Sequence, residues 1–143
     1  MKQLQNKTVL ITGGASGIGK ILARLFLEKQ AMVIIWDINE INLNETVSKL
    51  SSIGKIVGHK VDISNVEQIQ NAAKKVKQDY GSIDVLINNA GIIIGKYFHE
   101  HSTLDITKTM AINANAPMLI THEFLDGMIT KNDGHICNIA SSG

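Results

Sequence analysis

The chain has 143 residues, enough for one domain with a substantial core, and its 44% hydrophobic and 19% charged residues are typical of a globular protein. A formal net charge of +1 gives no electrostatic footprint for nucleic acid or an anionic membrane surface. From its polar N-terminal residues and short apolar runs we expect neither a signal peptide nor a membrane segment in this chain. The single cysteine, Cys137, suits core packing in a reducing compartment, which predicts a cytoplasmic protein without an internal disulfide.

Strand-like and helix-like segments alternate along the chain. Apolar, β-favouring runs predict five strands, over residues 8–11, 32–36, 55–61, 84–87 and 135–139. Helical periodicity predicts four helices between them: residues 17–29, a segment around Leu43, Val47 and Leu50, a segment from a capping box at 64–67 to Gly81, and a long segment over 104–128. A second capping candidate lies at 102–105, and Pro117 is expected to kink the long helix.

This alternation predicts an α/β fold, because connections too long for hairpins imply a parallel sheet with helices on both faces. Right-handed crossovers give a Rossmann-like, doubly wound sheet with strand order 3-2-1-4-5. Ligands of such folds bind outside the carboxyl ends of the strands, where the strand order reverses. Polar residues follow the predicted strands at that edge, and they are the candidate site residues.

A glycine-rich run, Thr-Gly-Gly-Ala-Ser-Gly-Ile-Gly over residues 12–19, joins the first strand to the first helix. Glycines there let the backbone turn sharply and approach a ligand closely. The unpaired amides and the dipole of the helix N-terminus then favour an anion, which predicts a site for the pyrophosphate of a dinucleotide. The candidate cofactor residues in this run are Gly13, Ser16, Gly17, Ile18 and Gly19.

Two carboxylates follow the second and third strands. Asp37 can accept hydrogen bonds from both hydroxyls of an adenosine ribose and would repel the extra phosphate of NADP, which predicts NAD as the cofactor. The alternative is a helix cap, which Asp37 or Asn39 could form. Asp62 can accept from the adenine amino group, with the backbone of Ile63 beside it, or it can form a loop turn before the next helix.

The fourth strand ends in Asn-Asn-Ala-Gly, residues 88–91. Small residues permit close approach of the backbone to a ribose, and the amide side chains can bind loops across the sheet. We expect Asn89, Ala90 and Gly91 to lie at the middle of the cofactor, although a simple turn would use the same residue types.

Taken together, the run 12–19, Asp37, Asp62 and the run 88–91 resemble the motifs of the short-chain dehydrogenase/reductase family. The glycine spacing Gly-x-x-x-Gly-x-Gly is similar to that of the family's ordinary short-chain branch. Residues 36–39 and 128–136 resemble the retinol and 17β-hydroxysteroid dehydrogenase group within it. The resemblance covers the whole chain.

This resemblance implies hydride transfer between a nicotinamide cofactor and an alcohol or carbonyl substrate, by a set of Asn, Ser, Tyr and Lys. It places the family's helix asparagine at Asn113 and the serine that hydrogen-bonds the reacting oxygen at Ser141, with Ser142 as the alternative. The family's Tyr-x-x-x-Lys is missing, because the two tyrosines are followed four residues later by Asp84 and His101.

We therefore expect residues 1–143 to be the dinucleotide-binding part of an enzyme, incomplete at the C-terminus, inactive alone and with the fifth strand as an open edge. The resemblance also implies the family's last strands and helices, and a homo-oligomer, in a full-length protein. The alternatives are a non-catalytic NAD-binding module and a related fold for a flavin or nucleoside, against which Asp37 argues. No nucleic acid and no metal is expected, and His99 and His101 are interpreted as loop residues.

Overall fold

Five parallel strands form one sheet in the order β3-β2-β1-β4-β5 in the computed structural model, which describes residues 3–140. The strands are β1 (Thr8–Thr12), β2 (Met32–Asp37), β3 (Ile56–Lys60), β4 (Val85–Asn88) and β5 (His135–Asn138). The predicted Rossmann-like topology is confirmed, and each strand begins and ends within one residue of its predicted bounds. The order reverses between β1 and β4, so their carboxyl ends open the crevice in which such folds bind ligands.

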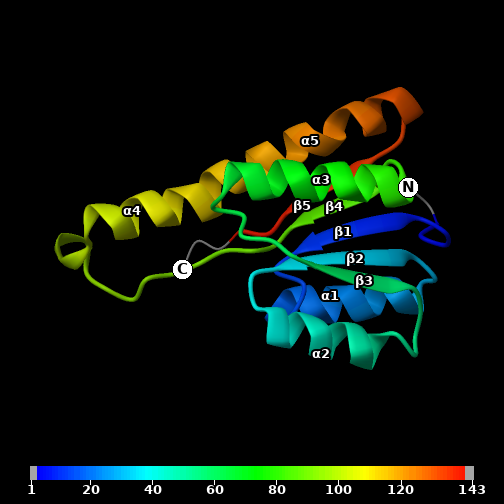
Figure 1. Ribbon diagram of the computed structural model, residues 1–143, viewed down its shortest axis with the longest axis horizontal. Helices are drawn as coiled ribbons and strands as arrows, with labels where there is room; N and C mark the ends of the chain where they lie inside the picture. The colour runs from blue at the N-terminus through cyan, green and yellow to red at the C-terminus, as the bar shows by residue number, and fades with distance from the viewer. Residues whose placement is uncertain (1–2, 141–143) are drawn as a thin grey trace.

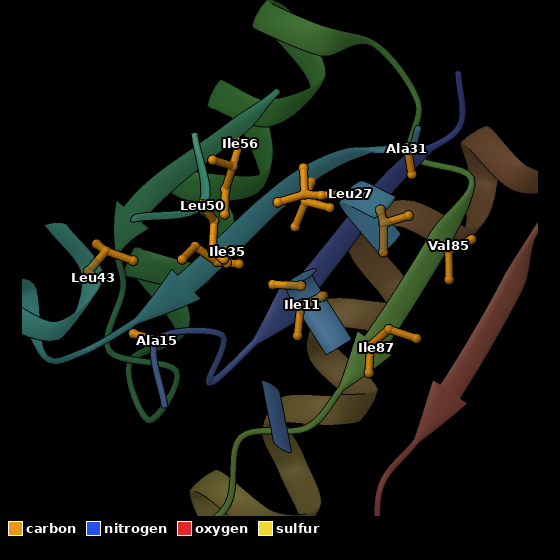
Figure 2. Packing of buried hydrophobic residues seen from close by; sticks show 13 residues of the cluster. Ile11, Ala15, Leu27, Ala31, Ile35, Leu43, Leu50, Ile56, Val85 and Ile87 are labelled. Atoms are coloured by element: carbon orange, nitrogen blue, oxygen red, sulfur yellow. The ribbon is translucent and has the colours of Figure 1, made fainter. Parts of the chain in front are cut away.

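Helices cover both faces of the sheet, as Figure 1 shows. On one face lie α1 (Gly17–Glu28) and α2 (Glu40–Leu50), and on the other lie α3 (Val66–Tyr80) and α5 (Ala116–Lys131). Alternate strand residues therefore enter two separate cores. Figure 2 shows the first, to which Ile11, Ile35 and Ile87 of neighbouring strands and Leu27 of α1 contribute. In the second, the fully buried Trp36 packs against Phe124 with 6.1 Å between ring centroids.

The face of α1 that meets the sheet is made of small residues as well as large ones. Gly19, Ala23 and Leu27 are buried there, whereas Ile18 and Ile21 are 58% and 56% exposed. Small side chains let the helix backbone come close to the sheet, and this close approach brings the N-terminus of α1 beside the glycine-rich loop.

The predicted helix over 104–128 is a succession of three helical segments: α4 (Thr103–Met110), a π-helical turn η2 (Ala111–Asn115) and α5. Pro117 in the first turn of α5 has no N–H to give to the carbonyl four residues back. In the π turn the Ala116 N–H donates to the Ala111 carbonyl, five residues back. A π turn thus stands where the proline predicted a kink, and α4 extends beyond the end of the sheet (Figure 1).

One of the two predicted capping boxes is confirmed. Ser102 Oγ accepts from the Asp105 N–H (3.1 Å) and the Asp105 carboxylate accepts from the Ser102 N–H (3.0 Å). These contacts, with the Lys96 ammonium nearby, lower the pKa of Asp105 to about 2. The predicted box at 64–67 is wrong, because Asn65 and not Ser64 is the N-cap of α3. The Ser64 hydroxyl donates to the Asp62 carboxylate. Gly81 follows the last residue of α3, as predicted.

At the sheet edge β5 is only partly covered. Ile136 and Cys137 are half-buried, and His135 and Asn138 are exposed. Cys137 packs against the core on the α1 side, so the predicted packing role is met only in part. Within residues 3–140, no helix is both long and apolar enough to cross a membrane.

Candidate nucleotide-binding site

A cleft of about 180 Å³ opens at the carboxyl ends of the strands, beside the point where the strand order reverses. It is lined by residues from the loops after β1, β2, β3 and β4, so the fold brings together segments that are far apart in the sequence. The predicted cofactor residues among its lining are Gly13, Ser16, Asp37, Asp62, Ile63, Ala90 and Gly91. Apolar residues complete it, with Trp36, Val61 and Ile112 among them.

The glycine-rich loop is folded tightly onto the start of α1. Gly13 has φ +64°, in the left-handed region that favours glycine. A Cβ on Gly19 would lie 2.1 Å from the Gly13 carbonyl oxygen and 2.6 Å from Asn89 Nδ2, so no larger residue fits there without moving the loop. The predicted residues Gly17 and Ile18 are exposed in the first turn of α1, and Gly19 lies buried beneath the loop.

The N-terminus of α1 suits an anion. Ser16 is its N-cap residue, but the Ser16 side chain makes no capping hydrogen bond and is exposed at the cleft. The first turn of the helix carries no acidic residue, so no carboxylate there would repel an anion bound at the positive end of the helix dipole. Unpaired amides, a hydroxyl and close glycine packing are what a bound pyrophosphate requires, and the loop therefore fits this part of a dinucleotide.

Asp37 is held by two backbone amides. Its Oδ2 accepts from the Ala15 N–H at 3.1 Å, and its Oδ1 accepts from the Asn39 N–H at 3.0 Å. Asn39, whose side chain accepts from the Asn42 N–H, is the cap of α2, so the helix cap is not formed by Asp37. Each carboxylate oxygen has further lone pairs, which leaves Asp37 able to accept from two ribose hydroxyls.

Asp62 forms the loop turn, one of the two roles that the sequence left open, and it also lies at the cleft. Its Oδ1 accepts from the N–H and the hydroxyl of Ser64, at 2.9 Å and 2.6 Å, which is the predicted loop turn. Among the described residues this turn uses only Oδ1, and Asp62 also lines the cleft beside Ile63. The second oxygen can thus accept from an adenine amino group without opening the turn.

Asn89 binds the glycine-rich loop and does not line the cleft. Its Nδ2 donates to the carbonyls of Thr12 (3.1 Å) and Gly13 (3.2 Å). The Thr12 hydroxyl in turn accepts from the N–H groups of Asn89 and Ala90, both at 3.1 Å. Thr12 is 2% exposed and was not among the predicted site residues. A hydroxyl in an otherwise apolar strand end was the signal that could have found it.

Asn88 connects three elements at the same end of the sheet. It is 3% exposed, and its Nδ2 donates to Asn138 Oδ1 of β5 at 2.8 Å and to Thr121 Oγ1 of α5 at 3.3 Å. This network orients the end of β5. The predicted catalytic residue Ser141, and its alternative Ser142, lie just after it and outside the described residues.

Asn113, the predicted catalytic asparagine, lies in the π turn. Its Oδ1 accepts from the Ile92 N–H at 2.9 Å and its Nδ2 donates to the Ile92 carbonyl at 2.8 Å. This paired contact holds the loop after β4 beside the cleft, whose lining includes Ile92 and Ile112. The Asn113 side chain therefore fixes the position of this loop relative to the π turn.

His99 and His101 lie in and after a single 3-10 turn (Phe98–Glu100), away from the cleft lining. His99 stacks on Tyr97 with 6.0 Å between centroids, and His101 packs against Phe98 at 6.4 Å. Over residues 3–140, no three His, Cys, Asp or Glu side chains gather as metal ligands.

A parallel sheet with a glycine-rich turn and a cleft at its switch point defines a dinucleotide-binding fold of the Rossmann type. The chain belongs to the short-chain dehydrogenase family, whose model matches residues 7–143. It is 38% identical over 142 residues to estradiol 17-beta-dehydrogenase 11 of Pongo abelii, covering 99% of this chain and 47% of that protein. It is 33% identical over 143 residues to epidermal retinol dehydrogenase 2 of Mus musculus, covering 99% and 46%.

A metagenomic short-chain oxidoreductase, solved in complex with NADP, superposes with a TM-score of 0.93 at 30% identity, covering 98% of this chain and 64% of that one. The chain spans about half the length of the curated relatives it matches. It thus carries the nucleotide-binding region of a short-chain oxidoreductase, and its resemblance to the 17β-hydroxysteroid and retinol dehydrogenase group is confirmed.

Proposed function

We propose that this chain is the NAD-binding part of a short-chain oxidoreductase that transfers a hydride between NAD(H) and an alcohol or the matching carbonyl compound. The observation that carries the proposal is the position of Asp37, which lines the cleft and is oriented by the amides of Ala15 and Asn39. A fixed carboxylate there favours a ribose with two free hydroxyls over one that carries a phosphate. A member of the family binds NADP, so family membership alone does not decide between NAD and NADP. The preference for NAD is inferred from Asp37 and is tested separately below.

Each loop around the cleft would bind a different part of the cofactor. Ser16 and the first amides of α1 would hold the pyrophosphate, and Asp37 the adenosine ribose. Asp62 and Ile63 would hold the adenine, and Ala90 and Gly91 the middle of the cofactor. When bound, the nicotinamide supplies or accepts the hydride, while the protein binds and orients the reactants.

Substrate chemistry would depend on Ser141, which we propose hydrogen-bonds the reacting oxygen, and on Asn113, which holds the adjoining loop. The names of the relatives favour a steroid- or retinoid-like alcohol as the substrate class. These 143 residues contain no Tyr-x-x-x-Lys. A phenol has a pKa near 10, and only a nearby cation lowers it enough for acid–base catalysis at neutral pH.

We therefore expect these 143 residues alone to bind NAD without oxidising alcohols. A non-catalytic NAD-binding module is the second candidate, because it would use the same cofactor residues of the cleft. An intact mass well above 15.6 kDa for the protein from its natural source, with a downstream Tyr-x-x-x-Lys, would support the enzyme. A natural mass of 15.6 kDa, with NAD binding and no turnover, would support the module.

Asp37→Ala is expected to weaken NAD binding by about 1.5–3 kcal/mol, or roughly 10- to 150-fold, because a charge-assisted hydrogen-bond acceptor is lost. Calorimetric titration with NAD and NADP measures this, and the preference for NAD should shrink. Glu40→Gln is the matched control, since Glu40 is an exposed carboxylate paired with Lys60 and lies outside the cleft lining. Unchanged NAD affinity in Asp37→Ala would remove Asp37 from this role.

A further inference from the structure

The backbone of Ala15, in the middle of the glycine-rich loop, is held from two sides by side chains of other elements. Asp37 Oδ2 accepts from the Ala15 N–H at 3.1 Å. The Thr46 hydroxyl of α2 donates to the Ala15 carbonyl at 3.2 Å. Thr46 is fully buried and Ala15 is 4% exposed, so water does not compete for these bonds. We call this pair of contacts the Ala15 clamp.

The packing of α2 does not itself require a threonine at position 46. Thr46 lies among apolar neighbours on the buried face of α2, with Leu43 and Leu50. Threonine is a poorer helix former than the straight-chain residues, and its hydroxyl is unfavourable in an apolar interface unless it is hydrogen-bonded. Valine has nearly the same shape without the hydroxyl. The contact that explains the hydroxyl is therefore the bond to Ala15.

The Thr46 hydroxyl also determines where the next amide points. The Ala15 carbonyl and the Ser16 N–H belong to one planar, trans peptide unit, so they point in opposite directions. Because Thr46 draws the carbonyl towards α2, the Ser16 N–H is turned to the opposite side. Ser16 lines the cleft and is the N-cap of α1, at the site suited to a pyrophosphate.

We propose that Thr46 is a positioning residue for cofactor binding. Its hydroxyl orients the Ala15–Ser16 peptide so that the Ser16 N–H can donate a hydrogen bond to the pyrophosphate. The proposal rests on the proposed function, because it assigns a role within the same site. Thr46 itself lines no part of the cleft, and it acts only through Ala15. The clamp also links the two halves of the adenosine diphosphate site, since Asp37 belongs to both the clamp and the ribose site.

The test compares Thr46→Val, which removes the hydroxyl and keeps the shape, with Thr46→Ser, which keeps the hydroxyl. Calorimetric and NMR titrations of the 143-residue chain use NAD, ADP and adenosine. In the valine variant we expect NAD and ADP to bind about tenfold more weakly, because a loosely held loop is in its binding conformation for only part of the time. Adenosine, which has no phosphate, should bind within twofold of the unsubstituted chain, and the serine variant should bind all three within threefold.

A second measurement needs no ligand. Hydrogen exchange of the buried Ala15 amide should be at least tenfold faster in the valine variant and little changed in the serine variant, because only the former opens the clamp. Equal exchange rates in the two variants would overturn the proposal even if neither bound NAD.

The other outcomes separate this proposal from the proposed function. If the unsubstituted chain bound no NAD, the proposed function would fail, and with it the role of Thr46 in cofactor binding. If it bound NAD and the valine variant bound equally well, only the role of Thr46 would fail. A loss of adenosine as large as that of NAD would show that Thr46 acts through Asp37. If the valine variant did not fold while the serine variant did, the hydroxyl would be required for the stability of the whole fold. This result, like an equal loss of adenosine binding, would overturn the proposal.

Discussion

Alanine in place of Gly19 is expected to weaken NAD binding at least ~100-fold and to lower the free energy of unfolding by about 3 kcal/mol, at the upper end of overpacking effects. The added Cβ would lie 2.1 Å from the Gly13 carbonyl oxygen and 2.6 Å from Asn89 Nδ2. The loop would have to move away from α1, and the bonds from Asn89 to Thr12 and Gly13 would break. The cofactor would then lose the arrangement of amides at the start of α1.

Gly17→Ala is the matched control, two residues earlier in the first turn of α1. A Cβ there meets nothing within 4 Å, and the only penalty arises from its φ of +50°. We expect a loss of stability of about 1 kcal/mol, from the left-handed conformation alone. Chemical denaturation and NAD titration of both variants measure the difference. Equal effects at the two positions would mean that steric exclusion at Gly19 is not what shapes the loop.

The second large effect is expected far from the cleft, at Asp84. Its side chain is 8% exposed, and it accepts from Lys131 Nζ at 2.6 Å and from the Thr8 N–H at 2.8 Å, with Lys7 Nζ at 3.6 Å. Asp84→Ala leaves two ammonium groups and one backbone amide without their shared partner. We expect a loss of about 3 kcal/mol, the lower end of the range for a broken buried pair, because both lysines are partly exposed.

Asp133→Ala is the control, because Asp133 pairs with the same Lys7 but is 43% exposed. Exposed pairs contribute about 0–1 kcal/mol, so little change is expected. Both variants should keep their NAD affinity, since neither residue lines the cleft. A stable Asp84→Ala variant, within 1 kcal/mol of the unsubstituted chain, would contradict the assignment of a structural role to this carboxylate.

The loss of stability at low pH should also depend on the Asp84 carboxylate. Burial of Asp84 disfavours its charged form, but the bonds from Lys131 and Thr8 and the charge of Lys7 outweigh this and hold its pKa below the ordinary 3.8. A carboxyl with a lowered pKa stabilises the folded state above its unfolded pKa, and this stability is lost as the pH falls through the folded pKa. The loss therefore lies below about pH 4, and it should be smaller in Asp84→Ala.

Much of the architecture could be predicted because it depends on local patterns in the sequence. Apolar runs of strand length alternate with helical periodicity, and the connections permit only parallel, right-handed crossovers. Topology then places the end of every strand at one edge, so Asp37, Asp62 and Gly91 could be assigned to one site from their positions alone. The glycine-rich turn was equally readable, because its spacing follows from backbone requirements within a single loop.

Contacts between distant segments could not be predicted in the same way. A local competition was missed as well: the Ser64 hydroxyl donates to Asp62, two residues before it, and Asn65 caps α3 in its place. The sequence allowed the Asn89 amide to bind a loop across the sheet, but only the folded sheet shows that its acceptors are the Thr12 and Gly13 carbonyls.

The sequence by itself determined the Rossmann-like order of strands, the glycine-rich turn and the position of the carboxylate after the second strand, because each depends on local periodicity or on one short motif. Only the tertiary structure decided that Thr12 and Thr46 hold this turn and that Asn113 is bound to the loop after β4. A hydrogen bond between segments 20 to 80 residues apart depends on the packing of helices onto the sheet. The residue types alone, Thr and Asn, are as common on a solvated surface as in such a contact.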